Sequence, residues 1–341
     1  MKHLLNRYKI LFILYIPFFI FILVICLTKT KCSITTTGSI TDLSSIFTTS
    51  NNYNTEGSLN SVFVYDNEKI TIFQKFVGKL DKNATVYEPT KNYSLFTSSE
   101  VYRMGVIQKN QSLEASAIYA YKKANLIDSS ISIDYNFLGY IVSYYIKSDD
   151  QQFALGDIIT KINGVEANDS NFHDAYVNMM EGSVVEVLRN NTLITLTLNS
   201  ASANYIVNDK IYSHISYYKK YNVSYSAATP ALNISKIDSI GPSAGLMQTL
   251  AIYNSLISDD ITKGRTIVGT GTIDEDGNVG EIGGIEQKVV AAFKNKADVF
   301  LCPEDNYEDG YNQYLKLGRK KRRMKFVMVS SFDTALEALN D

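Results

Sequence analysis

The sequence predicts an α+β fold built from several parts behind one N-terminal transmembrane helix. Three observations predict it. An uninterrupted apolar stretch lies near the start, short alternating segments separated by turn residues fill the middle, and two apolar helical patterns in the last third each begin after a glycine-containing turn. The length of 341 residues fits about two domains. Hydrophobic residues make up 45% of the chain, and the net charge of −2 gives no reason to expect a nucleic-acid partner.

Residues 1–31 are expected to form a cytoplasmic tip and a signal anchor. Ile10 to Leu27 is apolar and close to the ~20 residues that a membrane-spanning helix needs, with Pro17 as its only helix-breaking residue. Basic residues flank this stretch, at Lys2, Arg7, Lys9, Lys29 and Lys31. Their weak bias favours a cytoplasmic N-terminus, a helix in the lipid bilayer, and a single-pass protein of the cell membrane with extracytoplasmic C-terminal domains. A cleaved signal peptide is the alternative, but residues 28–33 lack an Ala-x-Ala-like site.

Residues 32–134 are expected to form an exported, mixed α/β region. Up to residue 54 the chain is rich in Thr, Ser and Asn without periodicity, which indicates a stalk or an irregular layer. Residues 61–65 and 70–73 alternate as strands do, and residues 100–124 follow a helical pattern. We assign no chemistry to this region.

Residues 135–200 predict a short β-rich domain. Residues 158–162 are typical of a strand, Asn163-Gly164 of a hairpin turn, and residues 172–180 of a helix. Residues 184–188 and 193–198 are expected to pair as strands around Asn190-Asn191.

Residues 201–341 contain two motifs joined by a connector. The first is Gly241-Pro242-Ser243-Ala244-Gly245, a tight turn before a stretch that is apolar at helical spacing as far as Ile257. The second is Gly283-Gly284 followed by Lys288, which opens an apolar run over residues 289–293. The connector combines a strand-like stretch over residues 266–273 with a hairpin turn over residues 274–279. This part therefore predicts a domain that presents a serine and a lysine, each near a helix start.

Ser243 and Lys288 are candidate partners in nucleophilic catalysis. A serine hydroxyl needs a neighbouring base, and a lysine is a base only when an apolar setting keeps its amine neutral. The run after Lys288 offers such a setting, and the start of a helix offers Ser243 unpaired N–H groups for an oxyanion. The alternative is an ordinary turn with a capping serine and a surface lysine.

Other chemistries have weaker support in the sequence. The chain has three histidines, His3, His173 and His214, and no His-Glu-x-x-His motif, so a metalloprotease is not indicated; a serine hydrolase using His214 stays an alternative. Cys26, Cys32 and Cys302 suggest no disulfide framework, although a bridge from Cys32 to Cys302 stays open. No Gly-x-x-x-x-Gly-Lys-Ser/Thr motif occurs, so we expect no ATP and no other cofactor.

With these motifs in place, residues 205–341 resemble the proteolytic domain of Lon-type serine proteases. That family places its nucleophile in a Gly-Pro-Ser-Ala-Gly turn and its lysine after Ile-Gly-Gly-hydrophobic-x-x-Lys. The resemblance implies that Ser243 is the nucleophile and Lys288 the general base. It is strongest to the membrane-anchored, ATPase-less branch of Gram-positive and related bacteria, which carries a PDZ domain before the protease. Ile240 departs from relatives that have a second glycine there. Full-length Lon proteases form rings, which leaves a homo-oligomer open.

The β-rich domain resembles a PDZ domain, with Gly156-Asp157 and Asn163-Gly164 as landmarks. The resemblance implies that Phe137-Leu138-Gly139-Tyr140 is the loop whose N–H groups capture a peptide carboxylate. The alternative is a plain turn before a strand. Residues 148–153 depart from the usual PDZ pattern. The basic run from Arg319 to Arg323 is expected to be a solvated loop, with contact to anionic lipid as the alternative.

These expectations combine into one hypothesis: an ATP-independent serine endopeptidase with a Ser/Lys dyad. It would cleave exported peptides or unfolded segments at the outer membrane face, helped by a PDZ-like domain. The competing hypothesis is a catalytically silent PDZ scaffold that holds exported C-terminal peptides.

Overall fold

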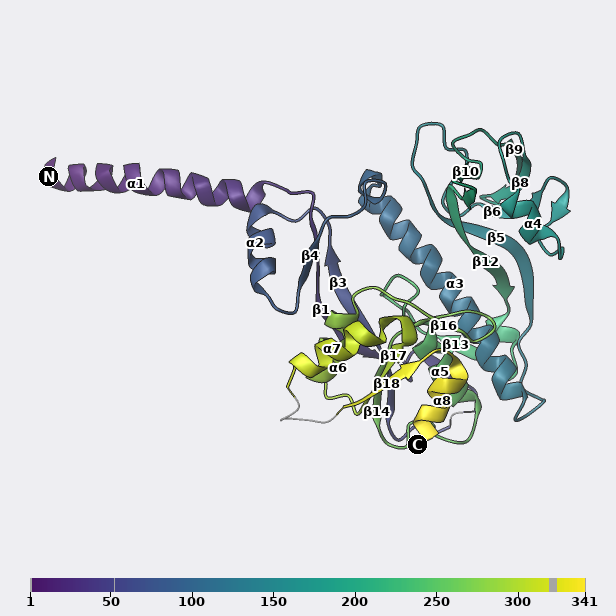
Figure 1. Ribbon diagram of the computed structural model, residues 1–341. Coiled ribbons are helices and arrows are strands. Elements are labelled where there is room, and N and C mark those ends of the chain that lie inside the picture. The colour runs from purple at the N-terminus through teal and green to yellow at the C-terminus, as the bar shows by residue number, and fades with distance from the viewer. Residues whose placement is uncertain (1, 52, 319–323, 341) are drawn as a thin grey trace.

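The computed structural model describes residues 2–51, 53–318 and 324–340, with side chains in the first helix described at positions 8, 9, 13 and 15–27 (Figure 1). The helices are α1 (Lys2–Leu27), α2 (Ile72–Leu80), α3 (Ser98–Asn125), α4 (Phe172–Val177), α5 (Gly245–Leu256), α6 (Ile285–Lys294), α7 (Tyr307–Lys316) and α8 (Phe332–Asn340). Short 3-10 turns are η1 (Tyr93–Leu95), η2 (Tyr225–Ala227) and η3 (Glu304–Asn306). The basic run from Arg319 to Arg323 lies outside the described residues.

The strands before residue 200 are β1 (Ser33–Asp42), β2 (Phe47–Thr49), β3 (Ser58–Asn67), β4 (Thr85–Tyr87), β5 (Tyr135–Tyr145), β6 (Ile158–Ile162), β7 (Val165–Glu166), β8 (Val184–Arg189) and β9 (Thr192–Thr197). The later strands are β10 (Tyr205–Val207), β11 (Lys210–Tyr212), β12 (Ile215–Val223), β13 (Leu232–Ile234), β14 (Thr266–Gly269), β15 (Thr272–Ile273), β16 (Val279–Gly280), β17 (Val299–Pro303) and β18 (Lys325–Val329).

The main sheet has the order β18-β17-β14-β3-β1-β4. Strands β3, β14, β17 and β18 run parallel to one another, while β1 pairs antiparallel with both β3 and β4. Strands from the first 87 residues therefore complete a sheet whose other strands come after residue 265. The domain boundaries at residues 134 and 200 stay a prediction. The main sheet combines strands that precede residue 134 with strands that follow residue 200.

Helices cover both faces of the main sheet. Alternate residues of one strand point to opposite faces, and β14 shows this with Ile267 in one core and Val268 in another. The first core contains α3, α5 and α8, with Leu246 and Leu250 fully buried. The second contains α6 and α7, with Val289 fully buried. The helix that follows the candidate serine, α5, and the helix that carries the candidate lysine, α6, thus lie on opposite faces of one sheet.

A second sheet has the order β12-β5-β6-β8-β9 and carries α4. Its own core includes Val142, Ile159 and Val187, all fully buried. The turn residues Asn163 and Gly164 have positive φ, as do Asn190 and Asn191, which are the conformations that tight hairpins require.

Helix α3 runs between the two sheets (Figure 1). It begins after Thr97, whose side chain accepts from the Glu100 N–H while Glu100 reaches back to the Thr97 N–H. Farther along α3, the buried carboxylate of Glu114 forms an ion pair with Lys220 of β12 and accepts a hydrogen bond from the Tyr221 N–H at 3.0 Å. Helix α3 therefore holds the second sheet against the first core, which contains α5.

The predicted N-terminal transmembrane helix is wrong, and the structure is a mixed α/β fold. Helix α1 is present, but among the described residues no helix is long and apolar enough to cross a membrane. The side chains of Lys2 and Arg7 lie outside the described residues. The cellular location expected from this helix stays a prediction.

Candidate active site

Ser243 lies in a tight turn that α3 holds in place. Gly241 has φ +89°, a conformation that glycine adopts without strain, and its N–H donates to Gly105 O at 2.9 Å. The Ser112 hydroxyl donates to Pro242 O at 3.0 Å. Two residues of α3 therefore fix the backbone on the N-terminal side of the serine.

Helix α5 begins directly after this turn, at Gly245. A Cβ at Gly245 would lie 2.7 Å from Ser112 Oγ and 2.9 Å from Ile273 N, so only glycine fits where the turn enters the helix. Ala244 provides no side-chain cap. Among the described residues, the N–H groups of Ser243 and Ala244 have no hydrogen-bond acceptor. The positive end of the α5 dipole and two free donors therefore lie beside the serine, as the sequence predicted for an oxyanion site.

Lys288 lies in the first turns of α6. Gly284, with φ +69°, precedes the helix, and the Lys288 N–H donates to Gly284 O at 3.0 Å. The side chain is only 2% exposed, and burial lowers the pKa of its amine from 10.5 to about 7. No carboxylate forms an ion pair with it within the part of the chain that the structure describes. A substantial fraction of this amine is therefore neutral at pH 7.

Thr270 connects the two candidate residues. The Lys288 Nζ donates to Thr270 Oγ1 at 3.1 Å, and that hydroxyl donates to Ser243 O at 2.9 Å. The Gly271 N–H also donates to Ser243 O, at 2.9 Å. No hydrogen bond joins Ser243 Oγ to Lys288 Nζ in the described residues, but such contacts are often long before substrate binds. Thr270 follows β14, and nothing in its local sequence marks it as part of the site.

Ser243 and Lys288 line one cleft of about 450 Å³. Its other walls come from β1, β3 and the end of β4, with Thr35, Asp66 and Tyr87, and from residues 238–240 before the turn. The sequence of the N-terminal region indicated no chemistry, because its contribution to the cleft depends on strand pairing across about two hundred residues. The structure therefore brings the predicted pair together and adds walls that the sequence did not indicate.

The predicted carboxylate loop, Phe137-Leu138-Gly139-Tyr140, lies inside β5 and does not line this cleft. Phe137, Gly139 and Tyr140 are in register with β12, and Tyr140 also with Ile159 of β6. The Tyr140 ring stacks on Phe172 of α4 with centroids 4.6 Å apart. These residues form a paired strand, where the sequence predicted a loop.

The alternative nucleophiles and bases do not meet at the cleft. His214 Nδ1 lies at hydrogen-bonding distance from Ala203 O, and its ring packs on Tyr205 with centroids 4.6 Å apart. Neither His214 nor His173 lines the cleft. Cys302 is buried, and burial raises the pKa of its thiol to about 12. Cys26, Cys32 and Cys302 are all free, so the bridge from Cys32 to Cys302 does not form.

Comparison with known proteins agrees with this geometry. The sequence model of the Lon protease (S16) C-terminal proteolytic domain matches residues 164–340, slightly more than half of the chain. The chain is similar to Lon proteases of Clostridium acetobutylicum (36% identical over 97 residues), Chlamydia pneumoniae (32% over 100) and Campylobacter jejuni (36% over 97). Each match covers 28% of this chain and 12%, 11% and 12% of the respective relative, so the chain spans about a tenth of the relatives' length. The chain belongs to the family of Lon protease (S16) C-terminal proteolytic domains, which are serine peptidases.

Proposed function

We propose that the protein is a serine endopeptidase that cleaves peptide bonds with Ser243 as nucleophile and Lys288 as general base. The observation that carries the proposal is the buried Lys288 amine. Its pKa of about 7 keeps much of it neutral at physiological pH, and one threonine hydroxyl joins it to the backbone of Ser243.

The reaction begins when the Ser243 hydroxyl attacks the carbonyl carbon of a peptide bond bound in the cleft. Lys288 Nζ takes the hydroxyl proton, and the N–H groups of Ser243 and Ala244 stabilise the negative oxygen that forms. The ammonium then returns its proton to the leaving amine, and an acyl-enzyme remains on Ser243. The same amine next takes a proton from water, which attacks the ester carbonyl; the ammonium then returns that proton to the departing Ser243 oxygen as the acid is released. Thr270 holds both partners and takes no part in bond making.

The substrates we propose are short peptides and unfolded protein segments. No Gly-x-x-x-x-Gly-Lys-Ser/Thr motif occurs in the 341 residues, which supports cleavage without ATP hydrolysis by this chain. A protease that does not unfold its substrates acts on segments that are already extended.

The second sheet is proposed to assist binding as a PDZ-like domain. A six-stranded sheet in the order β12-β5-β6-β8-β9, with β7 beside β6, and the short helix α4 support this proposal. Of the four residues assigned to peptide capture, Leu138 lies at an irregularity in the β5–β12 register and is exposed. If the protein binds peptides through this domain and does not cleave them, it is a catalytically silent scaffold.

The test compares hydrolysis of a fluorescein-labelled, unfolded casein by the full chain and by two variants, Ser243→Ala and Lys288→Met. Each substitution should lower the rate at least a thousandfold, because each removes one of two groups that act together. Two matched controls should retain activity: Ser129→Ala, exposed beyond the end of α3, and Lys294→Met, exposed on the same helix as Lys288. Equal hydrolysis by all five proteins would reject the dyad. Peptide binding with no turnover by the unaltered chain would favour the scaffold.

A further inference from the structure

Four polar side chains share one face at the end of the main sheet: Ser33, Thr35, Asp66 and Tyr87. Thr35 of β1 lies opposite Asp66 of β3, and Ser33 lies opposite Tyr87 of β4. Ser33 and Thr35 are two positions apart, so their side chains point to the same side of β1. Thr35, Asp66 and Tyr87 line the cleft that contains Ser243, whereas Ser33 lines a neighbouring pocket.

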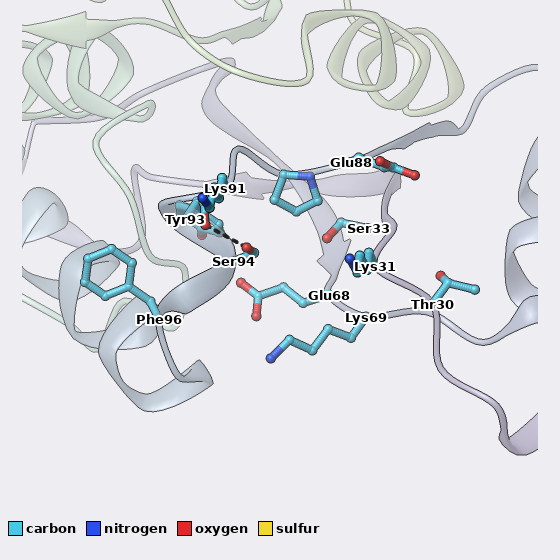
Figure 2. A pocket seen from close by; sticks show the side chains of 11 residues that line it. Thr30, Lys31, Ser33, Glu68, Lys69, Glu88, Lys91, Tyr93, Ser94 and Phe96 are labelled. Atoms are coloured by element: carbon cyan, nitrogen blue, oxygen red, sulfur yellow. Dashed lines mark hydrogen bonds between the residues drawn. The ribbon is translucent and has the colours of Figure 1, made fainter. Parts of the chain in front are cut away.

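The neighbouring pocket has a volume of about 470 Å³ and is drawn in Figure 2. The Ser33 hydroxyl and the Glu68 carboxylate point into it (Figure 2). Ser33 is 1% exposed, and its Oγ has no hydrogen-bond partner among the described residues. Burial of a hydroxyl without a hydrogen-bond partner costs free energy. The pocket is therefore suited to a ligand with a polar group that forms this hydrogen bond.

Ser33 of the pocket lies opposite Tyr87 of the cleft, so the two hollows adjoin where β1 pairs with β4. Ser33 and Thr35 lie about 7 Å apart along β1 at the usual rise of a strand, which corresponds to two residues of an extended peptide. An extended chain can therefore run along this face from the cleft at Ser243 to the pocket at Ser33.

Asp66 gives this path a fixed negative charge. Thr35 Oγ1 donates to Asp66 Oδ1 at 2.8 Å and the Tyr87 hydroxyl donates to Oδ2 at 3.0 Å, while the residue stays exposed. Within the described residues, no lysine or arginine forms a salt bridge with Asp66. The other carboxylate of the cleft, Asp238, already pairs with Lys236 at 2.7 Å. Phe63 adds an aromatic surface for the stem of a long side chain.

We propose, on the basis of the proposed function, that the cleft and the pocket at Ser33 form one substrate groove, in which Asp66 selects an arginine or lysine side chain near the scissile bond. Asp66 is then a specificity-determining residue, and the Ser33 hydroxyl binds a backbone group of the peptide farther along. The pocket at Ser33 is lined by Lys31, Lys69 and Lys91. A preference for an acidic substrate residue in that pocket is therefore the competing outcome.

The experiment uses quenched fluorescent peptides of neutral sequence, in which one arginine, its uncharged isostere citrulline, or one glutamate moves through each position. The unaltered full chain should cleave the best arginine peptide about tenfold to a hundredfold more efficiently than its citrulline counterpart, as expected for a hydrogen bond to a charged group. Asp66→Asn retains an oxygen for Thr35 and Tyr87 and should reduce this ratio to near one. The control Asp309→Asn, exposed on α7, should keep the ratio.

A second readout separates this inference from the proposed chemistry. The same peptides are titrated against Ser243→Ala and against Ser243→Ala with Asp66→Asn, and binding is followed by fluorescence anisotropy. Arginine preference in binding without cleavage by the unaltered chain would overturn the proposed function and support the groove. Cleavage with no arginine preference, a preference for glutamate, or a preference unchanged by Asp66→Asn would overturn the groove and leave the proposed function standing.

Discussion

Replacement of Lys288 by methionine should make the protein more stable, and by an amount that depends on pH. Methionine keeps an unbranched chain in the buried site and removes the amine. Burial lowers the pKa of that amine from 10.5 to about 7. The difference of about 3.5 corresponds to roughly 5 kcal/mol of unfolding free energy at 1.36 kcal/mol per pH unit.

The sign follows from proton binding. Between pH 7 and pH 10.5 the unfolded chain holds a proton on Lys288 and the folded chain does not, so stability rises with pH across this window. The free-energy cost of burying the Lys288 ammonium is absent above pH 10.5. It is fully present below pH 7, where the folded protein buries the charge. The advantage of Lys288→Met should therefore be largest at or below pH 7 and shrink by ~1.4 kcal/mol for each pH unit above it.

The assay is urea unfolding of both full chains at pH 7, 8 and 9, followed by circular dichroism because the chain has no tryptophan. From pH 7 to pH 9 the difference in unfolding free energy should fall by roughly 2.5 kcal/mol. Lys294→Met removes an exposed amine from the same helix and should show no such trend. A difference independent of pH, or a less stable methionine variant at pH 7, would refute the reasoning that the amine is desolvated.

Three further outcomes are expected. The kcat/KM for peptide cleavage should rise about tenfold per pH unit below pH 7 and level off above it, because only the neutral Lys288 amine accepts the proton; a flat profile from pH 5.5 to 8.5 would contradict this. Thr270→Val should lower kcat about tenfold to a hundredfold with little change in KM, and Thr270→Ser should restore it; equal kcat in both variants would argue against a positioning role. Gly245→Ala should destabilise the fold by about 1–3 kcal/mol in thermal melts, whereas Gly283→Ala, with open space around it, should melt like the unaltered chain.

The local parts of the site could be predicted from the sequence. A glycine-containing turn before an apolar helical pattern is a short-range signal, and α5 begins at Gly245, inside the predicted motif. The apolar run after Lys288 predicted a buried lysine, and the structure shows Lys288 buried on α6, which packs against β1 and β3. The catalytic roles of both residues stay predictions.

The walls of the cleft could not be predicted, because they depend on long-range pairing. Strand β3 pairs with β14, so Ser58 lies beside Thr266, and no feature of either strand specifies the other. Asp66 and Tyr87 reach the cleft only through that pairing. Thr270 was missed for a similar reason: its hydroxyl matters only once β14 places it between two helices.

The strand at Phe137 to Tyr140 shows the limit of a local resemblance. These residues were expected to form a loop because the resemblance to a PDZ domain implies one at this position. In the structure a Cβ at Gly139 would lie 2.3 Å from Ile159 O, so the glycine allows close approach of β6 within a continuous sheet. The aromatic and β-branched residues around it favour the strand.

The most direct test of the account is an NMR titration of the Lys288 amine in the full chain, with ¹⁵N-labelled lysine and Lys288→Met to assign the signal. A titration midpoint near pH 7 is predicted, since desolvation lowers the pKa of this group to about that value. A midpoint near the ordinary lysine value of 10.5 would show a solvated ammonium and would contradict the role of Lys288 as the base.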